Sequence, residues 1–154
     1  MVLLLVQGWD GMGLSLIGDL VIVDEKAKFT PAYSAIGLSP DAGLTWQLPK
    51  LVGMRKAQEI LLLNQTLSAI SALEYGLITE VVSSDQLETR VQDLVNQLMN
   101  SALPALGQTK QLLWASHQNS WTSHLEYEAE AIANLSSEVT AQERIHAFLD
   151  KKRA

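Results

Sequence analysis

Two short, uninterrupted apolar runs separated by a glycine-rich stretch constrain the fold of this chain most strongly. Residues 3–6 read LLLV and residues 20–23 read LVIV, and runs of this kind are typical of strands buried on both faces of a parallel sheet. The stretch between them, residues 11–19, has room for about two helical turns. A strand, a short helix and a second strand form a βαβ unit, whose crossover makes the two strands parallel.

The residues up to 82 continue to combine β-like runs with helical segments. A third β-like run covers residues 77–82, and two helices are expected over residues 54–63 and 68–75. Gly76 stands where glycine commonly ends a helix. We therefore predict an α/β part over residues 1–82.

Residues 83–154 carry helix signals throughout. Two patterns read as capping boxes, Ser83 with Gln86 and Thr140 with Glu143. Pro104 suits the first turn of a helix reaching to about residue 116, and another helix is expected over residues 122–135. The apolar stripes expected to be buried are Leu87, Val91, Leu94, Val95 and Leu98 in the first helix, and Ile145, Phe148 and Leu149 in the last.

Composition excludes several classes of protein. A formal net charge of -6 argues against nucleic-acid binding, which needs a basic face for phosphates. The chain has no cysteine, so disulfides and thiolate chemistry are excluded and a reducing cytoplasm is expected. No apolar run approaches the roughly 20 residues of a membrane span, and no basic segment of a secretory signal precedes the first apolar run. The three histidines (His117, His124 and His146) lack metal-ligand spacing, so no metal site is expected.

Several segments, in order, are similar to the enoyl-CoA hydratase/isomerase (crotonase) family. Residues 6–8 (VQG) resemble its strand-ending VNG, and residues 11–22 (GMGLSLIGDLVI) resemble its GMSLALAGDLVI segment. Residues 27–29, 32–43, 48–53, 72–77 and 148–152 follow at the family spacing. The resemblance implies an α/β, crotonase-like (ClpP/crotonase) fold in partial form. Residues 1–82 would be a remnant of the βαβ core, and residues 83–154 a C-terminal helical oligomerisation region.

The resemblance also implies that the chain starts inside the catalytic core. Family members have a long N-terminal section that supplies much of the CoA crevice and one backbone N–H of the oxyanion hole. Counting back from Asp19, the second oxyanion donor falls on the N–H of Asp10, with Gly11 in the same turn. Between Gly8 and Gly11 there are only two residues, several fewer than in the family. A carboxylate beside a developing oxyanion repels it unless it turns away, so whether the chain is active stays open.

The candidate acid/base is Asp41. Hydratases of the family carry glutamates at the positions of Gly13 and Tyr33, so hydration, which needs two carboxylates, is not expected. Residues 39–43 (SPDAG) resemble the isomerase-type members of phenylacetyl-CoA degradation, which implies that Asp41 shuttles a proton between two carbons. Two other roles are open for Asp41: capping the helix toward Leu51, and, ranked lower, attacking a halogenated ring as in dehalogenase-type members.

The resemblance assigns CoA contacts to the last helix. Phe148 and Lys151 match a phenylalanine and a lysine that hold the CoA adenine and phosphates, while core packing and a favourable cation at a helix C-terminus explain them equally. The implied partners are an acyl-CoA substrate and further copies in a trimer-based homo-oligomer, with no nucleic acid, membrane or cofactor besides the CoA thioester. The competing hypothesis is a non-catalytic truncated homologue, acting in assembly or with a partner chain or having no role of its own.

Overall fold

The computed structural model describes residues 3–6 and 9–151, and the side chains of residues 12–150. By their internal contacts these residues form two compact units, one ending at Leu94 and the other beginning at Val95. We call them the strand unit and the helical unit. The division into domains predicted at residues 82 and 83, with an oligomerisation role for the second, stays a prediction.

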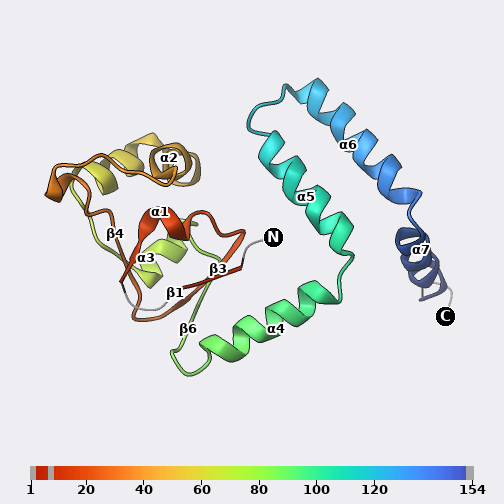
Figure 1. Cartoon of the computed structure of the whole chain (residues 1–154), viewed down its shortest axis with the longest axis horizontal. Coiled ribbons are helices and arrows are strands. Elements are labelled where there is room, and N and C mark those ends of the chain that lie inside the picture. Colours follow the sequence, from red (N-terminus) through yellow and green to blue (C-terminus); the bar gives the residue numbers. More distant parts are fainter. Residues whose placement is uncertain (1–2, 7–8, 152–154) are drawn as a thin grey trace. The chain divides into compact units, whose positions relative to one another are not determined.

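Parallel strands form the centre of the strand unit. Strands β1 (Leu3–Val6), β3 (Leu20–Asp24) and β6 (Glu80–Val82) form one sheet in the order β1-β3-β6, with all pairs parallel (Figure 1). The apolar run of β3 is buried from its second residue onward, as expected for a strand flanked on both sides. The predicted βαβ unit is therefore confirmed. The third β-like run is shorter than predicted, since β6 begins only at Glu80. Leu77 and Ile78 precede the strand and are buried in the core.

A second, smaller sheet was not predicted. Strand β2 (Trp9–Gly11) pairs in parallel with β4 (Lys28–Thr30), which pairs antiparallel with β5 (Leu67–Ser68). Helix α1 (Met12–Ser15) follows β2 directly. The backbone of Asp10 and Gly11 is thus held in a strand, and the turn predicted for these two residues is wrong. The physical reason is the pairing of Asp10 with Phe29, whose β4 side chain is buried in the core.

Three further helical segments complete the strand unit: η1 (Ser34–Ile36), α2 (Leu44–Leu62) and α3 (Ala69–Glu74). Helix α2 begins earlier than the predicted residue 54, and it is interrupted at Gly53, whose φ of 77° and ψ of 157° are not helical. Helix α3 is close to its prediction. Ser68 caps it by accepting a hydrogen bond from Ser71 N at 3.1 Å, and Gly76 follows with a φ of 70°.

The core of the strand unit lies where α1, α2 and α3 meet the strands. Phe29 of β4, Met12 of α1 and Ile60 of α2 are among its fully buried side chains. Tyr33 is half-buried and packs against this core. These contacts fix the ring of Tyr33 next to the start of α1.

The helical unit contains α5 (Leu103–Ala115), α6 (Trp121–Ser136) and α7 (Val139–Lys151), whereas α4 (Leu87–Met99) crosses the boundary between the units. Pro104 lies in the first turn of α5 as predicted. Both capping boxes are misplaced. Residues 83–86 form a turn closed by Gln86 N on Ser83 O at 3.0 Å, so α4 starts only at Leu87. Helix α7 starts at Val139, which puts Thr140 inside the helix.

The apolar stripes of the last helices are less buried than predicted. In α4 only Leu87 is fully buried, and the other four stripe residues are partly buried. In α7 the predicted buried face is wrong, since Ile145, Phe148 and Leu149 are 49%, 60% and 46% exposed. Helix α7 therefore has an apolar face that the described residues leave about half exposed. Among the described residues, no helix is both long and apolar enough to cross a membrane.

Candidate functional site

Asp41 occupies a tight turn that leads into α2. Ala42 and Gly43, which follow it, both have left-handed backbones, with φ of 49° and 76°. The carbonyl of Asp41 accepts a hydrogen bond from Leu44 N at 2.9 Å, which closes the turn. Leu44 is fully buried, so the turn is tied to the core while the side chain of Asp41 is exposed.

Tyr33 meets Asp41 across this turn. Its phenol donates a hydrogen bond of 2.7 Å from Oη to Asp41 Oδ1. The backbone of Tyr33 is held as well, because its carbonyl accepts from Ile36 N at 3.1 Å and from Leu38 N at 3.0 Å. The sequence marked Tyr33 only as a lost glutamate. Its pairing with Asp41, eight residues away, is a contact between two turns that no periodicity signals.

Gly13 forms the third side of the site. A Cβ atom built on Gly13 would lie 3.1 Å from Ala42 Cβ, 3.4 Å from the carbonyl oxygen of Asp41 and 3.6 Å from Tyr33 Oη. The beginning of α1 therefore approaches both the turn and the phenol closely. The structure brings together three sequence-predicted positions, Gly13, Tyr33 and Asp41, in what we call the Asp41 site.

The helix-capping explanation of Asp41 is wrong. The N-cap of α2 is Gly43, and no side chain caps this end of the helix. The Asp41 carboxylate is instead engaged by the Tyr33 phenol. This carboxylate is thus available for a role other than holding the helix.

The charge of Asp41 acts on its neighbour. The hydrogen bond to the Asp41 carboxylate is the main reason why the pKa of Tyr33 is raised above its usual value, and burial of the phenol adds to the effect. Tyr33 is therefore a neutral hydrogen-bond donor at physiological pH. Among the three described residues of the Asp41 site, only Asp41 has a carboxylate, and with a neutral phenol beside it this group can accept and return a proton. Activating water as well would need a second group.

The predicted oxyanion donors lie just before this site in the chain. Asp10 and Gly11 end β2, and Gly11 is followed at once by α1, whose second residue is Gly13. The side chain of Asp10 is outside the described side chains. The assignment of the two N–H groups to an oxyanion hole stays a prediction.

The predicted CoA contacts lie in the helical unit. Phe148 and Lys151 are on α7, Lys151 as its last residue. Since Phe148 is 60% exposed, core packing within this chain does not explain it. The side chain of Lys151 is outside the described side chains, and both assignments stay predictions.

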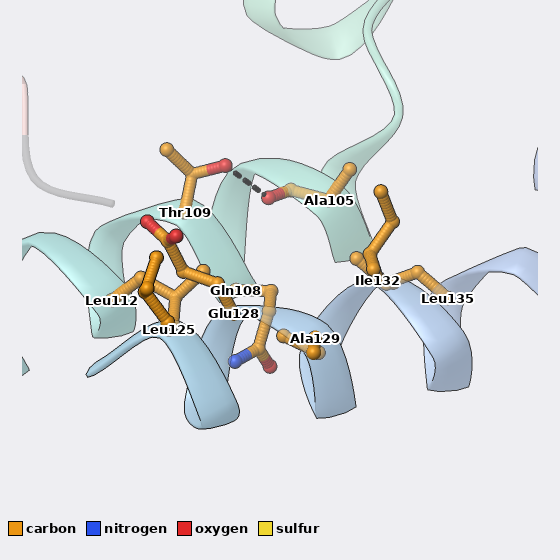
Figure 2. Close-up of a pocket in the computed structure, with 10 residues that line it drawn as sticks. Ala105, Gln108, Thr109, Leu112, Leu125, Glu128, Ala129, Ile132 and Leu135 are labelled. Carbon is orange, nitrogen blue, oxygen red and sulfur yellow. Dashed lines mark hydrogen bonds between the residues drawn. The ribbon is translucent and has the colours of Figure 1, made fainter. Parts of the chain in front are cut away.

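An apolar hollow of about 490 Å³ lies between α5 and α6 of the helical unit (Figure 2). Leu112, Leu125 and Ile132 line it. The polar side chain of Thr109 is turned back, because its hydroxyl donates to the carbonyl of Ala105 in its own helix at 2.8 Å. None of the predicted site residues lines this hollow.

Comparison with known proteins adds a family likeness over almost the whole chain. Residues 6–154 match the family model described as enoyl-CoA hydratase/isomerase. The chain is 35% identical over 142 residues to 1,2-epoxyphenylacetyl-CoA isomerase of Escherichia coli (strain K12), covering 92% of this chain and 54% of that protein. It is 32% identical to 4-chlorobenzoyl coenzyme A dehalogenase-1 of Arthrobacter sp, covering 92% of this chain and 51% of that protein.

A solved structure gives the same result. An enoyl-CoA hydratase/isomerase from Cupriavidus metallidurans CH34 superimposes with a TM-score of 0.92 at 32% identity, over 97% of this chain and 57% of that one. The chain spans about half the length of the curated relatives it matches.

Proposed function

Because this chain belongs to the enoyl-CoA hydratase/isomerase family, we propose that it acts on an acyl-CoA thioester and isomerises it through an enolate, with Asp41 as acid and base. The partial crotonase-like fold predicted from the sequence is confirmed. The reaction is a double-bond or ring isomerisation and needs no cofactor besides the CoA of the substrate. The absence of cysteine supports a reducing, cytoplasmic location as part of the same proposal.

The observation that carries this proposal is the composition of the Asp41 site. Gly13, Tyr33 and Asp41 lie together, and only Asp41 has a carboxylate. Hydration needs one group to activate water and another to protonate carbon. Isomerisation needs a single group, because the proton removed from one carbon returns to another. The site supports the second reaction.

The step balances without an added reagent. Asp41 removes a proton from the carbon next to the thioester carbonyl, and the electron pair of the broken C–H bond moves into an enolate that is conjugated with the double bond. Backbone N–H groups of Asp10 and Gly11 are proposed to stabilise the enolate oxygen. The protonated Asp41 then returns the proton to a different carbon. The product is an isomer of the substrate, and no water is consumed.

Binding and turnover test this proposal in order. Calorimetric titration of the purified chain with free CoA and a short enoyl-CoA is expected to give a dissociation constant near or below about 100 μM. Double-bond migration in a 3-enoyl-CoA is then followed by proton NMR. Asp41→Asn is expected to abolish migration, while the matched control Asp93→Asn, an exposed aspartate on α4, keeps it. No heat at millimolar ligand from a folded chain overturns the proposal.

The exposed side chain of Asp41 also allows a test for the reaction named for the dehalogenase relative. Chloride release from 4-chlorobenzoyl-CoA, lost in Asp41→Asn, would assign Asp41 as a nucleophile on an aromatic ring. Trp46, 44% exposed on the following helix, is the aromatic residue nearest in sequence. Double-bond migration without chloride release supports the isomerase.

A second candidate function is assembly without catalysis. It is favoured by one observation: the helical unit exposes large apolar side chains, among them Ile132 at 71% and Phe148 at 60%. Such surfaces favour association. We propose a homo-oligomer, trimer-based, with the hollow between α5 and α6 near its contacts.

Light scattering tests the association. Ile132→Glu is expected to lower the molar mass toward that of one chain, whereas Glu126→Gln on the same helix leaves it unchanged. A clean monomer of the unaltered chain contradicts the proposal of an oligomer. An oligomer that neither binds nor converts any CoA thioester supports assembly as the function.

A further inference from the structure

An exposed carboxylate on a turn needs a partner to act as a directed base. The side chain of Asp41 is exposed, and an unrestrained aspartate rotates about two side-chain bonds. Proton transfer to and from carbon requires one carboxylate oxygen at a defined place. Whatever limits this rotation therefore contributes to the reaction assigned above, on which the present inference rests.

Tyr33 is built to supply that restraint. Its ring packs against the core of the strand unit, and its carbonyl accepts two backbone hydrogen bonds, from Ile36 and Leu38. From this fixed base the phenol reaches Asp41 Oδ1 at 2.7 Å. The bond engages Oδ1 and leaves Oδ2 as the second oxygen of the exposed carboxylate.

We propose that Tyr33 is a positioning residue for the reaction: its phenol holds Oδ1 of Asp41, so that Oδ2 is presented as the oxygen that takes and returns the substrate proton. Gly13 is part of the same arrangement. Any side chain there would begin 3.1 Å from Ala42 Cβ and 3.6 Å from Tyr33 Oη, so its absence keeps this side of the pair free.

The chemistry of the pair fits the role. A phenol is a neutral donor, and a hydrogen bond from it to a carboxylate is stronger than one between two neutral groups. The Asp41 carboxylate also raises the pKa of Tyr33, which keeps the phenol protonated and donating. A second carboxylate at this position would repel Asp41, and a phenylalanine would leave Oδ1 unheld.

The test compares Tyr33→Phe with Tyr75→Phe on double-bond migration. Tyr75 is the matched control, because it is also half-buried and packs against the same core. Phenylalanine keeps the ring and its packing in both variants, and circular dichroism checks their folding. The proposal expects kcat to fall about tenfold or more in Tyr33→Phe, since a positioned hydrogen bond to a charged group is lost. KM should stay within about twofold, and Tyr75→Phe should match the unaltered chain.

A second measurement does not depend on turnover. With tyrosine labelled by ¹³C at Cζ, the phenol signal that disappears in Tyr33→Phe is followed against pH. Asp41→Asn is expected to lower the midpoint of this signal toward the usual tyrosine value, because Asp41 is the charged group that raises it.

The outcomes separate the two proposals. A kcat loss confined to Tyr33→Phe, together with a midpoint that moves in Asp41→Asn, supports the positioning role. An active unaltered chain whose Tyr33→Phe variant has the same kcat overturns the positioning role and leaves the isomerase. An unaltered chain that binds and converts no CoA thioester overturns the isomerase, and with it the positioning role, even if the midpoint moves.

Discussion

The position that a side chain of Gly13 would occupy lies against the methyl group of Ala42. A Cβ on Gly13 would be 3.1 Å from Ala42 Cβ, closer than two methyl groups pack at their optimal separation. Gly13 is itself buried. A side chain at Gly13 would thus press on the turn that carries Asp41, which would have to give by a few tenths of an ångström. Glycine at this position also removes one of the two glutamate positions of a hydratase.

Gly13→Glu is expected to destabilise the chain and not to create a hydratase. Overpacking costs about 1–3 kcal/mol, and the new carboxylate would lie beside Asp41. Urea unfolding and water addition to a 2-enoyl-CoA measure the two effects. Gly107→Ala is the control, since Gly107 in α5 has open space around it and should gain roughly 0.5–1 kcal/mol. Hydration by Gly13→Glu would show that the site has more room than its geometry allows.

Two substitutions in the Asp41 turn should change stability in opposite directions. Gly43 has a φ of 76°, and its added Cβ would lie 3.3 Å from Gln47 Nε2, so Gly43→Ala is expected to cost about 1–2 kcal/mol. Ala42, with a φ of 49°, already bears this kind of strain. Ala42→Gly is expected to gain up to about 1 kcal/mol. Urea denaturation of both variants measures the difference, and an equal loss in both would contradict the backbone argument.

The hydrogen bond of Tyr33 should make stability depend on pH at alkaline values, where the phenol loses its proton. The Asp41 carboxylate raises the pKa of Tyr33 in the folded chain, while in the unfolded chain it is near 10. A raised pKa contributes stability that is fully present below about pH 10 and is lost as pH rises through the folded value. The difference in unfolding free energy between the unaltered chain and Tyr33→Phe should be constant to about pH 9 and shrink above pH 10. A difference that shrinks toward acid pH within the range from 6 to 9 would contradict this assignment.

Alanine substitutions test the cap of α6 and the capping box that was predicted for α7. Ser120 caps α6 by accepting a hydrogen bond from Ser123 N at 3.3 Å, so Ser120→Ala is expected to cost about 1 kcal/mol. Thr140 lies inside α7, so Thr140→Ala should gain a few tenths of a kcal/mol, roughly the difference in helix propensity. Thermal unfolding followed by circular dichroism compares the two. A loss in Thr140→Ala as large as in Ser120→Ala would restore the capping box predicted from the sequence.

The structural elements that could be predicted were those with a signal in neighbouring residues of the sequence. The apolar runs at residues 3–6 and 20–23 predicted two parallel strands, because such runs have few other ways to bury both faces. Pro104 marked the start of α5 because its φ is fixed near the helical value, and Gly76 marked the end of α3 because glycine adopts a positive φ without strain. The family resemblance pointed to Asp41 through the residues around it. The short strands β2, β4 and β5, with three, three and two residues, were too short for any periodicity to show.

By itself, the sequence determined the βαβ unit of β1, α1 and β3, the helical character of the residues after 83, the family, and the presence of one carboxylate where a hydratase has more. Only the tertiary structure decided what that carboxylate does locally. Asp41 could have capped α2, but the left-handed backbones of Ala42 and Gly43 turn the chain so that Gly43 takes the cap position. The core holds Tyr33 within 2.7 Å of Asp41 instead. Side chains eight residues apart meet only when the backbone between them is folded, and that depends on packing contributed by α1, β4 and α2 together.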